Sequence, residues 1–420
     1  MSLISVGVDH EHASLDFLER VTVPEHQWSK VLRDLVSHAN IHEAVFVSTC
    51  LRTEVVAVID LFHGAIEEIT TTLATATGLD AHDFDDRLSV HFDRGVVTHL
   101  FSVAAGLKSA VPGEFEVLGQ LRRALELAIE EQSAGAELDD LFRRAIASGR
   151  HVRHETPISR GTTSFAQAAA SLAAETLGDD LSAATIVVVG AGQLALGVVR
   201  SLLTAPQAVG QVTIVNRTVA RAEALVAEVA DERLVVGAWD DLSRYLATAR
   251  LVVTAVEAPS PVITASQMAG CRQPVLLVDL GMPRTVATEL DEMLNVRRVD
   301  IGDLRERVAR ALDGRHDAFD AAHAMVLADV EKYLADQRAR GAATIVRELR
   351  DHFDEVVATE LSRHGHELDQ FSEEQRARIT SIVRSVVAKI AHRPTVSLKE
   401  AAGTDRGTRL SETTRALFDL

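Results

Sequence analysis

The chain has 420 residues, of which 47% are hydrophobic and 25% charged, a composition that excludes a disordered or fibrous protein. Its net charge of −18 argues against a surface that binds polyanions in general. Its two cysteines exclude a disulfide scaffold and a Cys-x-x-Cys metal site. Because we find no signal peptide and no apolar run of roughly 18–20 residues, we expect a soluble, cytoplasmic protein of two to three domains.

Residues 1–157 are predicted to form a first domain that mixes short β-rich runs with helical ones. Strands are expected at ISVGVDH, EAVFVST, TEVVAVID and LSVHF. Helices are expected at VTHLFSVAAGL and LGQLRRALELAIEEQ, where apolar residues recur at three- and four-residue spacing. Pro157 and Gly161 then break the helical pattern, so we predict an α+β domain that ends here.

Residues 158–301 alternate between apolar strands and helices. The helical stretch FAQAAASLAAETLG is followed by the strand TIVVVG, the helix QLALGVVRSLLT and the strand QVTIVNR. Further strands are expected at RLVVTAV and PVLLVDLG. Such continuous apolar runs are typical of a parallel sheet covered on both faces, so we predict a Rossmann-type α/β domain.

Residues 302–420 carry long amphipathic helical patterns with charged outer faces, such as AFDAAHAMVLADVEKYLADQRAR and EEQRARITSIVRSVVAKIAH. We expect no strands here, and interruptions of the helices at Gly341 and around Gly365. A monomer would leave the apolar stripes of these helices in water. The pattern therefore predicts an all-helical domain through which two chains pair.

A glycine-rich turn follows the strand TIVVV and opens a helix, and in this context such a turn binds a dinucleotide. It consists of Gly190, Ala191, Gly192, Gln193, Leu194 and Ala195. Gly190 permits the tight turn, and Gly192 lets the backbone approach a pyrophosphate at the helix N-terminus. Asn216 and Arg217 end the next strand, with Arg221 one turn later, where NAD-binding folds usually carry an acidic residue. These cations favour NADPH, and the alternative is a Rossmann-like domain with an accidental glycine turn.

Two regions of the first domain could carry chemistry. Cys50 lies at the junction of two expected strands, and the neighbouring Arg52 would lower the pKa of its thiol and favour the nucleophilic thiolate. The alternative is a small buried cysteine, which is also our interpretation of Cys271. His99 lies on an apolar helix, and a polar, glycine-punctuated stretch follows it, with Ser109, Glu114 and Gln120. Such a stretch can line a substrate pocket or can be an ordinary connection between helices.

Eight segments, in family order over essentially the whole chain, resemble the glutamyl-tRNA reductases, which begin five-carbon tetrapyrrole synthesis. They are SVGVDHEHASLDFLE, AVFVSTCLRTEV, HLFSVAAGLKSAVPGEFEVLGQ, VRHETPISRG, VVVGAGQLALGVV, VTIVNRTVARAEAL, LLVDLGMPR and VVAKIAHRPTVSLKEAA. The resemblance implies NADPH-dependent reduction of glutamyl-tRNA(Glu) to glutamate 1-semialdehyde, with release of tRNA. This is the first committed step of porphyrin and haem synthesis, and it would pass through a thioester on Cys50, which accepts hydride more readily than an ester.

The same resemblance implies roles for single residues and for partners. His99 would act as general base or orienting group near Cys50, and Arg52 would pair with a glutamate carboxylate. The other substrate-binding positions would be Thr49, Ser109, Glu114 and Gln120. The cofactor positions would be residues 190–195 with Asn216, Arg217 and Arg221, and no metal is expected. The C-terminal helices would form a V-shaped homodimer, and whether a glutamate-1-semialdehyde aminomutase docks in it stays open.

The chain departs from the family pattern beside the nucleophile, where Leu51 replaces the usual Asn. The usual Gly-Glu-Pro-Gln reads Gly-Glu-Phe-Glu over residues 113–116, and Pro112 replaces an apolar residue. A diverged, weakly active or regulatory homologue therefore stays an alternative. An NADP-dependent dehydrogenase of a free small acid, similar to shikimate dehydrogenases, would need neither Cys50 nor the long helices. A helical, nucleotide-binding regulator or scaffold would not need Cys50 either.

A cluster of arginines in the first domain bears on tRNA binding despite the acidic total charge: Arg122, Arg123, Arg143, Arg144, Arg150 and Arg153. These side chains could contact tRNA, or they could form a solvated helix face. The sequence leaves both interpretations open.

Overall fold

The computed structural model describes residues 2–49, 51–109, 116–156, 158, 164–206, 208–258, 260–312 and 316–420. Cys50 and Glu114 therefore lie outside the described residues. The chain divides into two compact units, Met1–Val326 and Leu327–Leu420. Among the described residues, no helix is both long enough and apolar enough to cross a membrane.

The first unit begins with an antiparallel-sheet domain, residues 2–156, whose four strands lie in the order β2-β3-β1-β4. The strands are β1 (Ser2–Asp9), β2 (Ile41–Thr49), β3 (Arg52–Ile59) and β4 (Ser89–Phe92). Every residue of the inner strand β3 is buried. Helices therefore have to cover both faces of the sheet.

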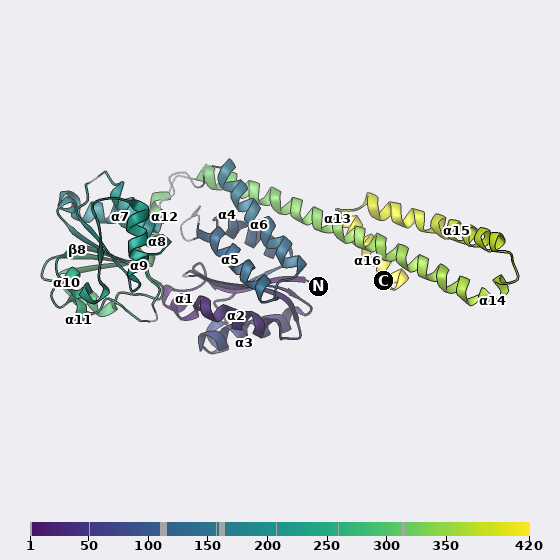
Figure 1. The fold of residues 1–420 in the computed structure, drawn as a ribbon, viewed down its shortest axis with the longest axis horizontal. Coiled ribbons are helices and arrows are strands. Elements are labelled where there is room, and N and C mark those ends of the chain that lie inside the picture. The colour runs from purple at the N-terminus through teal and green to yellow at the C-terminus, as the bar shows by residue number, and fades with distance from the viewer. Residues whose placement is uncertain are drawn as a thin grey trace. The chain divides into compact units, whose positions relative to one another are not determined.

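Figure 1 shows one set of helices on each face of this sheet. One set consists of α1 (Leu15–Val21), α2 (Glu25–Leu35) and α3 (Phe62–Thr77), and the short helix η1 (Ala81–Phe84) follows it in the chain. The other set consists of α4 (Arg94–Ala105), α5 (Glu116–Glu130) and α6 (Ala136–Glu155). The structure confirms the α+β class predicted for this part of the chain.

The first unit continues with a parallel-sheet domain, residues 164–312, in which all six strands are parallel and lie in the order β10-β9-β8-β5-β6-β7. The strands are β5 (Thr185–Val189), β6 (Val212–Val215), β7 (Leu234–Gly237), β8 (Ala249–Thr254), β9 (Val275–Asp279) and β10 (Val296–Asp300). This topology confirms the predicted Rossmann-type domain.

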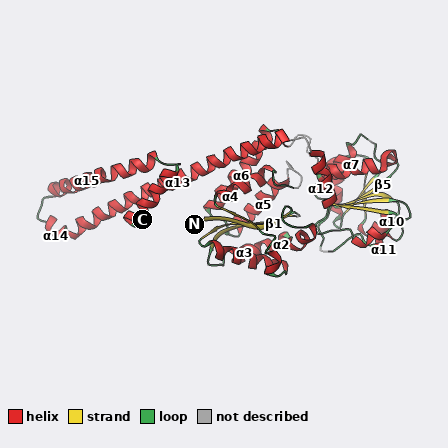
Figure 2. Cartoon of the chain, turned by 180° about the vertical axis from the view of Figure 1, so that it is seen from behind, coloured by secondary structure: helices red, strands yellow, loops and turns green. Residues whose placement is uncertain are grey.

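A hydrophobic core lies on each face of the parallel sheet, as the helices in Figure 2 indicate. The larger core includes α7 (Phe165–Leu177), α8 (Gln193–Leu203), α9 (Val219–Val229) and α12 (Ile301–Leu312). The smaller core includes α10 (Leu242–Leu246) and α11 (Ala265–Met268). Three short helices connect the larger elements: η3 (Gly178–Ser182), η4 (Trp239–Asp241) and η5 (Thr288–Glu292).

Strands β7 and β10, which form the two edges of the parallel sheet, were not predicted from the sequence. Val235 of β7 and Arg297 of β10 are exposed. Strand β10 reads VRRVD and lacks the continuous apolar run that identifies an inner strand, whereas β7 reads LVVG and is apolar but only four residues long.

The helical C-terminal region consists of α13 (His316–Arg363), α14 (Gly365–Leu368), α15 (Glu373–Glu400) and α16 (Asp405–Phe418). The predicted interruption around Gly365 is confirmed, because α13 ends at Arg363. The predicted interruption at Gly341 is wrong, because α13 continues through it. Glycine costs a helix roughly 1 kcal/mol relative to alanine, and burial of the residues that follow offsets this cost: Ala342, Ile345, Val346 and Leu349.

Candidate active site

The connection between β2 and β3 carries the predicted nucleophile. Thr49 at the end of β2 pairs with Arg52 at the start of β3, so Cys50 and Leu51 connect the two strands of an antiparallel hairpin. Cys50 lies outside the described residues. Leu51 is half-buried and packs against the larger hydrophobic core of the parallel-sheet domain. The two strands thus meet where the sequence predicts their junction.

A buried chain of polar side chains begins directly after this hairpin. Nη1 of Arg52 lies 3.0 Å from Oε2 of Glu54, and Nε2 of His99 lies 2.8 Å from Oε1 of the same carboxylate. The three side chains are 9%, 8% and 4% exposed, respectively. Arg52 and Glu54 point to the same side because alternate residues of a strand share a face, and α4 contributes His99. We call these three residues the Arg52–Glu54–His99 chain.

Glu54 is the central charge of this chain. Burial alone would raise the pKa of its carboxyl, but the charge and hydrogen bond of His99 and the charge of Arg52 outweigh burial and hold that pKa well below its usual range. A carboxylate survives burial only when it is paired in this way. Glu54 is therefore ionised and orients both neighbours, and His99 donates to it when Nε2 carries a proton.

Strand β1 approaches β3 closely at Glu54. Gly7 pairs with Glu54, and a Cβ at Gly7 would lie 2.4 Å from the carbonyl oxygen of Thr53 and 2.6 Å from Cα of Glu54. Glycine is therefore the residue that allows β1 and β3 to approach at this point. Ser5, two residues earlier on the same face, donates its hydroxyl to Oε1 of Glu54.

His91 of β4 stacks on His99, with ring centroids 4.1 Å apart and planes inclined by 25°. Burial and the charge of His99 lower the pKa of His91 to about 4, so His91 is neutral near pH 7. Both rings line a cavity of about 610 Å³ whose wall also includes Arg94 and Lys108. The wall also includes Asp320, and Nζ of Lys108 pairs with Glu11 at 2.6 Å, so the cavity carries charges of both signs.

Of the remaining predicted substrate residues, Thr49 and Ser109 lie near the Arg52–Glu54–His99 chain through contacts of Arg52, whereas Gln120 has no hydrogen bond to it among the described residues. Nη2 of Arg52 donates to the carbonyl of Lys108 at 3.0 Å. The half-buried Ser109 is the next residue in the sequence after Lys108. The hydroxyl of Thr49 donates to the carbonyl of Arg52 at 3.4 Å. Gln120 is half-buried on α5, and within the described ranges no hydrogen bond joins it to the Arg52–Glu54–His99 chain. Glu114 lies outside those ranges.

The glycine-rich turn connects β5 to α8. Gly190 has a φ of +124°, and a Cβ there would lie 2.3 Å from the carbonyl oxygen of Ala255, so the turn requires glycine. Gly192 caps α8 without a side-chain hydrogen bond, and a Cβ there would meet open space. Ala195 is fully buried, as close packing of helix and strand demands, whereas Gln193 is exposed and Ala191 and Leu194 are half-buried. Open space before the free N–H groups of a helix N-terminus fits a pyrophosphate.

A second cavity, of about 490 Å³, begins at this turn and extends along the carboxyl end of β6. Asn216 holds the backbone there, because its Nδ2 donates to the carbonyl of Thr218 at 2.8 Å. Arg217 and Arg221 line the cavity and are exposed. The residues present therefore fit a dinucleotide, and they place two cations where such folds usually recognise the ribose.

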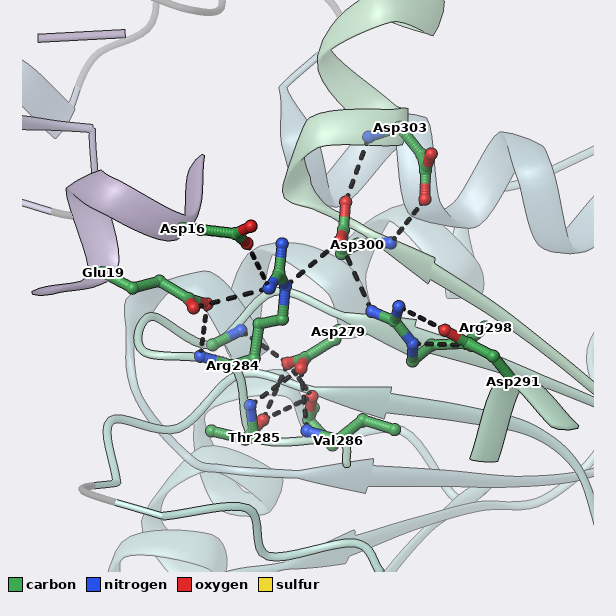
Figure 3. Close-up of polar contacts among 12 residues, drawn as sticks. Asp16, Glu19, Asp279, Arg284, Thr285, Val286, Asp291, Arg298, Asp300 and Asp303 are labelled. Carbon is green, nitrogen blue, oxygen red and sulfur yellow. Dashed lines mark hydrogen bonds and ion pairs between the residues drawn. The ribbon is translucent and has the colours of Figure 1, made fainter. Parts of the chain in front are cut away.

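Asp279 at the end of β9 organises the loop that follows it (Figure 3). Its Oδ1 accepts the hydroxyls of Thr254 and Thr285 at 2.6 and 2.7 Å. Its Oδ2 accepts the backbone N–H groups of Thr285 and Val286, both at 2.8 Å. The backbone N–H of Gly281 also donates to Oδ1 at 3.0 Å, so five hydrogen bonds to one buried carboxylate fix the backbone on both sides of Arg284.

Arg284 uses this fixed position to contact the antiparallel-sheet domain. Its Nη1 lies 2.7 Å from Oδ1 of Asp16, and its backbone N–H donates to Oε1 of Glu19 at 2.8 Å. Arg305 of α12 also donates to the carbonyl of His10, at 3.1 Å. The two domains of the first unit are thus joined by polar contacts from α1 and the end of β1.

Part of the arginine cluster is paired within its own helix. Arg143 and Arg144 of α6 form ion pairs with Asp139 and Asp140, four residues earlier. Such pairs are typical of a solvated helix face, which is the interpretation they favour for these two arginines.

Three family models match the chain in order. Residues 6–156 match the N-terminal domain of glutamyl-tRNAGlu reductase, residues 171–307 match shikimate/quinate 5-dehydrogenase, and residues 321–420 match the dimerisation domain of glutamyl-tRNAGlu reductase. A glutamyl-tRNA reductase from Salinispora tropica is 37% identical over 428 residues, which cover 100% of this chain and 92% of the relative. The solved glutamyl-tRNA reductase from Methanopyrus kandleri is 27% identical, with 100% of this chain and 99% of that chain covered and a TM-score of 0.51.

The parallel sheet, its glycine-rich turn and the matched dehydrogenase model define an oxidoreductase that uses a nicotinamide cofactor. With a relative of this identity over its full length, the chain belongs to the glutamyl-tRNA reductase family. The match to the dimerisation domain supports a homodimer. The domain limits 1–157, 158–301 and 302–420 stay predictions.

The sequence analysis missed Glu54, His91 and Arg284. Glu54 could have been found, because a carboxylate two residues after Arg52 in an apolar strand must share its buried face. His91 and Arg284 act through contacts with segments that are distant in the sequence, and although Arg284 ends the quoted segment LLVDLGMPR, its contact with Asp16 has no local signal.

Proposed function

We propose that the chain reduces glutamate esterified to tRNA(Glu) to glutamate 1-semialdehyde, with NADPH as the hydride donor. The observation that carries this proposal is the buried Arg52–Glu54–His99 chain, which begins two residues after Cys50. Arg52 supplies a cation and His99 supplies an imidazole, and the ionised carboxylate of Glu54 fixes the position of both side chains. Family membership supports the substrate class.

The first step that we propose forms a thioester on Cys50. The thiolate attacks the carbonyl carbon of the glutamyl ester, the new C–S bond replaces the C–O bond to the ribose, and the tRNA oxygen leaves with a proton. His99 is the group that we assign to accept the thiol proton, because the carboxylate of Glu54 lies 2.8 Å from its Nε2 and fixes the position of the imidazole ring. The two terminal nitrogens of Arg52 face Glu54, His99 and the carbonyl of Lys108, and we assign its other N–H donors to the carboxylate of glutamate.

The second step releases the aldehyde. When bound, NADPH supplies the hydride that the thioester carbon accepts. The C–S bond then breaks, and the sulfur of Cys50 regains a proton. The open N-terminus of α8 would hold the pyrophosphate, and Arg217 would neutralise the 2′-phosphate that distinguishes NADPH from NADH.

The proposal also includes a homodimer, docking of a second enzyme on that dimer, and a cytoplasmic location. Residues 321–420 would hold two chains together, as the matched dimerisation domain suggests. Docking of a glutamate-1-semialdehyde aminomutase on that dimer and a cytoplasmic location are predictions from the family resemblance.

The test supplies the full chain with glutamyl-tRNA(Glu) and NADPH and measures glutamate 1-semialdehyde and uncharged tRNA. We expect both products in equal amounts, with one NADPH consumed for each aldehyde formed. Free glutamate serves as the control and should give no aldehyde. Reduction of free small acids, with charged tRNA left intact, would contradict the proposal and favour a dehydrogenase of the shikimate type.

A further inference from the structure

Trp239 has no part in the function proposed so far, although it lines the cavity of about 490 Å³ at the end of β6. It is the first residue of η4, which follows β7, and its side chain is half-buried. The wall of the cavity also includes Gly192 and Asn216. An indole at this position therefore faces the same space as the expected cofactor residues.

The guanidinium of Arg217 lies over the face of this indole, with Cζ 5.2 Å from the ring centroid. This distance is within the range of a cation–π interaction, and tryptophan is the aromatic residue that makes the strongest one. In the part of the chain that the structure describes, no carboxylate forms an ion pair with Arg217. The contact with Trp239 is thus the interaction that orients the exposed Arg217 side chain.

Stacking leaves the donors of a guanidinium available. Its five N–H groups point outward in the plane of the group, whereas the indole contacts only its flat face. A phosphate could therefore accept two parallel hydrogen bonds from the edge of Arg217 while the stack is kept. Because the plane is already fixed, less conformational freedom would be lost on binding.

We propose that Trp239 is a positioning residue that holds Arg217 ready for the 2′-phosphate of NADPH, and that preference for NADPH over NADH depends on this stack. The proposal rests on the proposed function, because it requires Arg217 to face that phosphate. It adds that two residues recognise the 2′-phosphate together. They are Arg217 after β6 and the uncharged Trp239 after β7. Arg221, the other cation of the cavity, has no aromatic partner among the described residues.

The chain offers suitable variants for a test. It has two tryptophans, and the other, Trp28, lies in the antiparallel-sheet domain, where its indole donates to the carbonyl of Val23. A Trp28→Phe background therefore makes Trp239 the single indole reporter. Arg244 lies over the ring of Tyr245 at the same distance of 5.2 Å but does not line the cavity. Arg244 also pairs with Asp241 of η4 at 3.2 Å, so Arg244→Ala is a control that removes a stack and a contact to η4 while leaving the cavity wall intact.

The experiment measures dissociation constants of the full chain for NADPH, NADH and adenosine 2′,5′-bisphosphate by calorimetry. Indole fluorescence in the Trp28→Phe background gives a second readout. We expect Trp239→Ala to weaken binding of NADPH and of the bisphosphate by about threefold to fivefold, as for one partly exposed cation–π contact. NADH binding should change by less than about twofold, since NADH lacks the phosphate that Arg217 recognises. Trp239→Phe should restore part of the loss, and Arg244→Ala should have no effect.

A double-mutant cycle with Arg217→Ala separates positioning from simple packing. If Trp239 acts through Arg217, then Trp239→Ala should have no further effect on NADPH binding once Arg217 is alanine. An undiminished effect in that background would overturn the inference, as would a Trp239→Phe variant that binds like Trp239→Ala. Were Arg217→Ala to weaken NADPH and NADH equally, the proposed choice of cofactor would fail as well. Were Arg217→Ala to act selectively and Trp239→Ala not at all, the inference alone would fail.

Discussion

The guanidinium of Arg284 lies 2.7 Å from the carboxylate of Asp16, a residue 268 positions earlier, and this ion pair links the two domains of the first unit. Glu19 is a second partner, with Oε2 3.5 Å from Nη1 of Arg284. The side chain of Asp16 is 75% exposed and that of Glu19 only 16%. Because water screens exposed pairs, the half-buried Glu19 contributes more to the stability of this junction than Asp16 does.

Arg284→Ala should therefore lower the free energy of unfolding by about 1–3 kcal/mol, because it leaves the half-buried Glu19, and Asp300 at 3.3 Å from Nε, without their cation. Asp16→Asn, the matched control, should lower it by less than about 1 kcal/mol. Urea unfolding at neutral pH measures both values. Equal losses for the two variants would show that burial of Glu19 does not set the strength of the junction.

His91 gives stability a defined dependence on pH. Burial and the charge of His99 lower its pKa to about 4 in the folded chain, below the ordinary value of 6.5. Between these values the unfolded chain binds more protons than the folded one, so stability rises with pH. His91→Phe keeps a ring on His99 but cannot titrate. We expect the unfolding free energy of the wild type, relative to His91→Phe, to fall as the pH decreases from 6.5 towards 4 and to be constant above 6.5. A difference that does not vary with pH would contradict the assignment.

Leu51 is the clearest departure from the family pattern, and its half-buried side chain packs against the core of the parallel-sheet domain. Leu51→Asn should remove this apolar contact and cost about 1 kcal/mol of stability. Because Arg52 and Thr49 remain, kcat/KM should change by less than about tenfold, which is ~1.4 kcal/mol of transition-state free energy. A thousandfold gain in activity from near zero would instead identify a disabled homologue and favour the regulator hypothesis.

Helix α15 exposes an apolar stripe in which three residues recur every four positions. Ile382, Val386 and Ile390 are 58%, 52% and 62% exposed. Val386→Glu would place a charge in the middle of this stripe and should convert the dimer to a monomer in sedimentation velocity. Leu294→Glu, at a fully exposed leucine of the parallel-sheet domain, is the control and should remain dimeric. A dimeric Val386→Glu variant would show that the stripe is not the interface.

Local pattern was sufficient to predict most of the fold. The apolar runs of β5, β8 and β9 carry their own signal because inner parallel strands are buried on both faces. The edge strand β10 (VRRVD) lacks that signal because charged residues interrupt it, and the apolar run of β7 (LVVG) is only four residues long. Gly341 misled the prediction because a local preference was outweighed by packing of the residues after it.

Spacing alone predicted the candidate site only where its members lie close in sequence, and the more distant His99 was assigned through the family resemblance. Cys50, Arg52 and the turn from Gly190 to Ala195 are contiguous motifs, so their spacing reveals them. The contact of Glu54 with His99 depends on how α4 packs on the sheet, and the stack of Trp239 on Arg217 depends on the order of β6 and β7. Neither relationship has a spacing that could be recognised before the fold is known.

The central claim, that Cys50 forms a thioester with glutamate, is tested most directly by mass spectrometry of the chain after incubation with glutamyl-tRNA(Glu) in the absence of NADPH. Cys271 provides the control, because it is buried and burial raises the pKa of its thiol. We predict one glutamyl adduct on Cys50 in the wild type and in Cys271→Ser, and none in Cys50→Ser. A Cys50→Ser variant that forms the aldehyde from charged tRNA and NADPH at a rate comparable with the wild type would contradict the account.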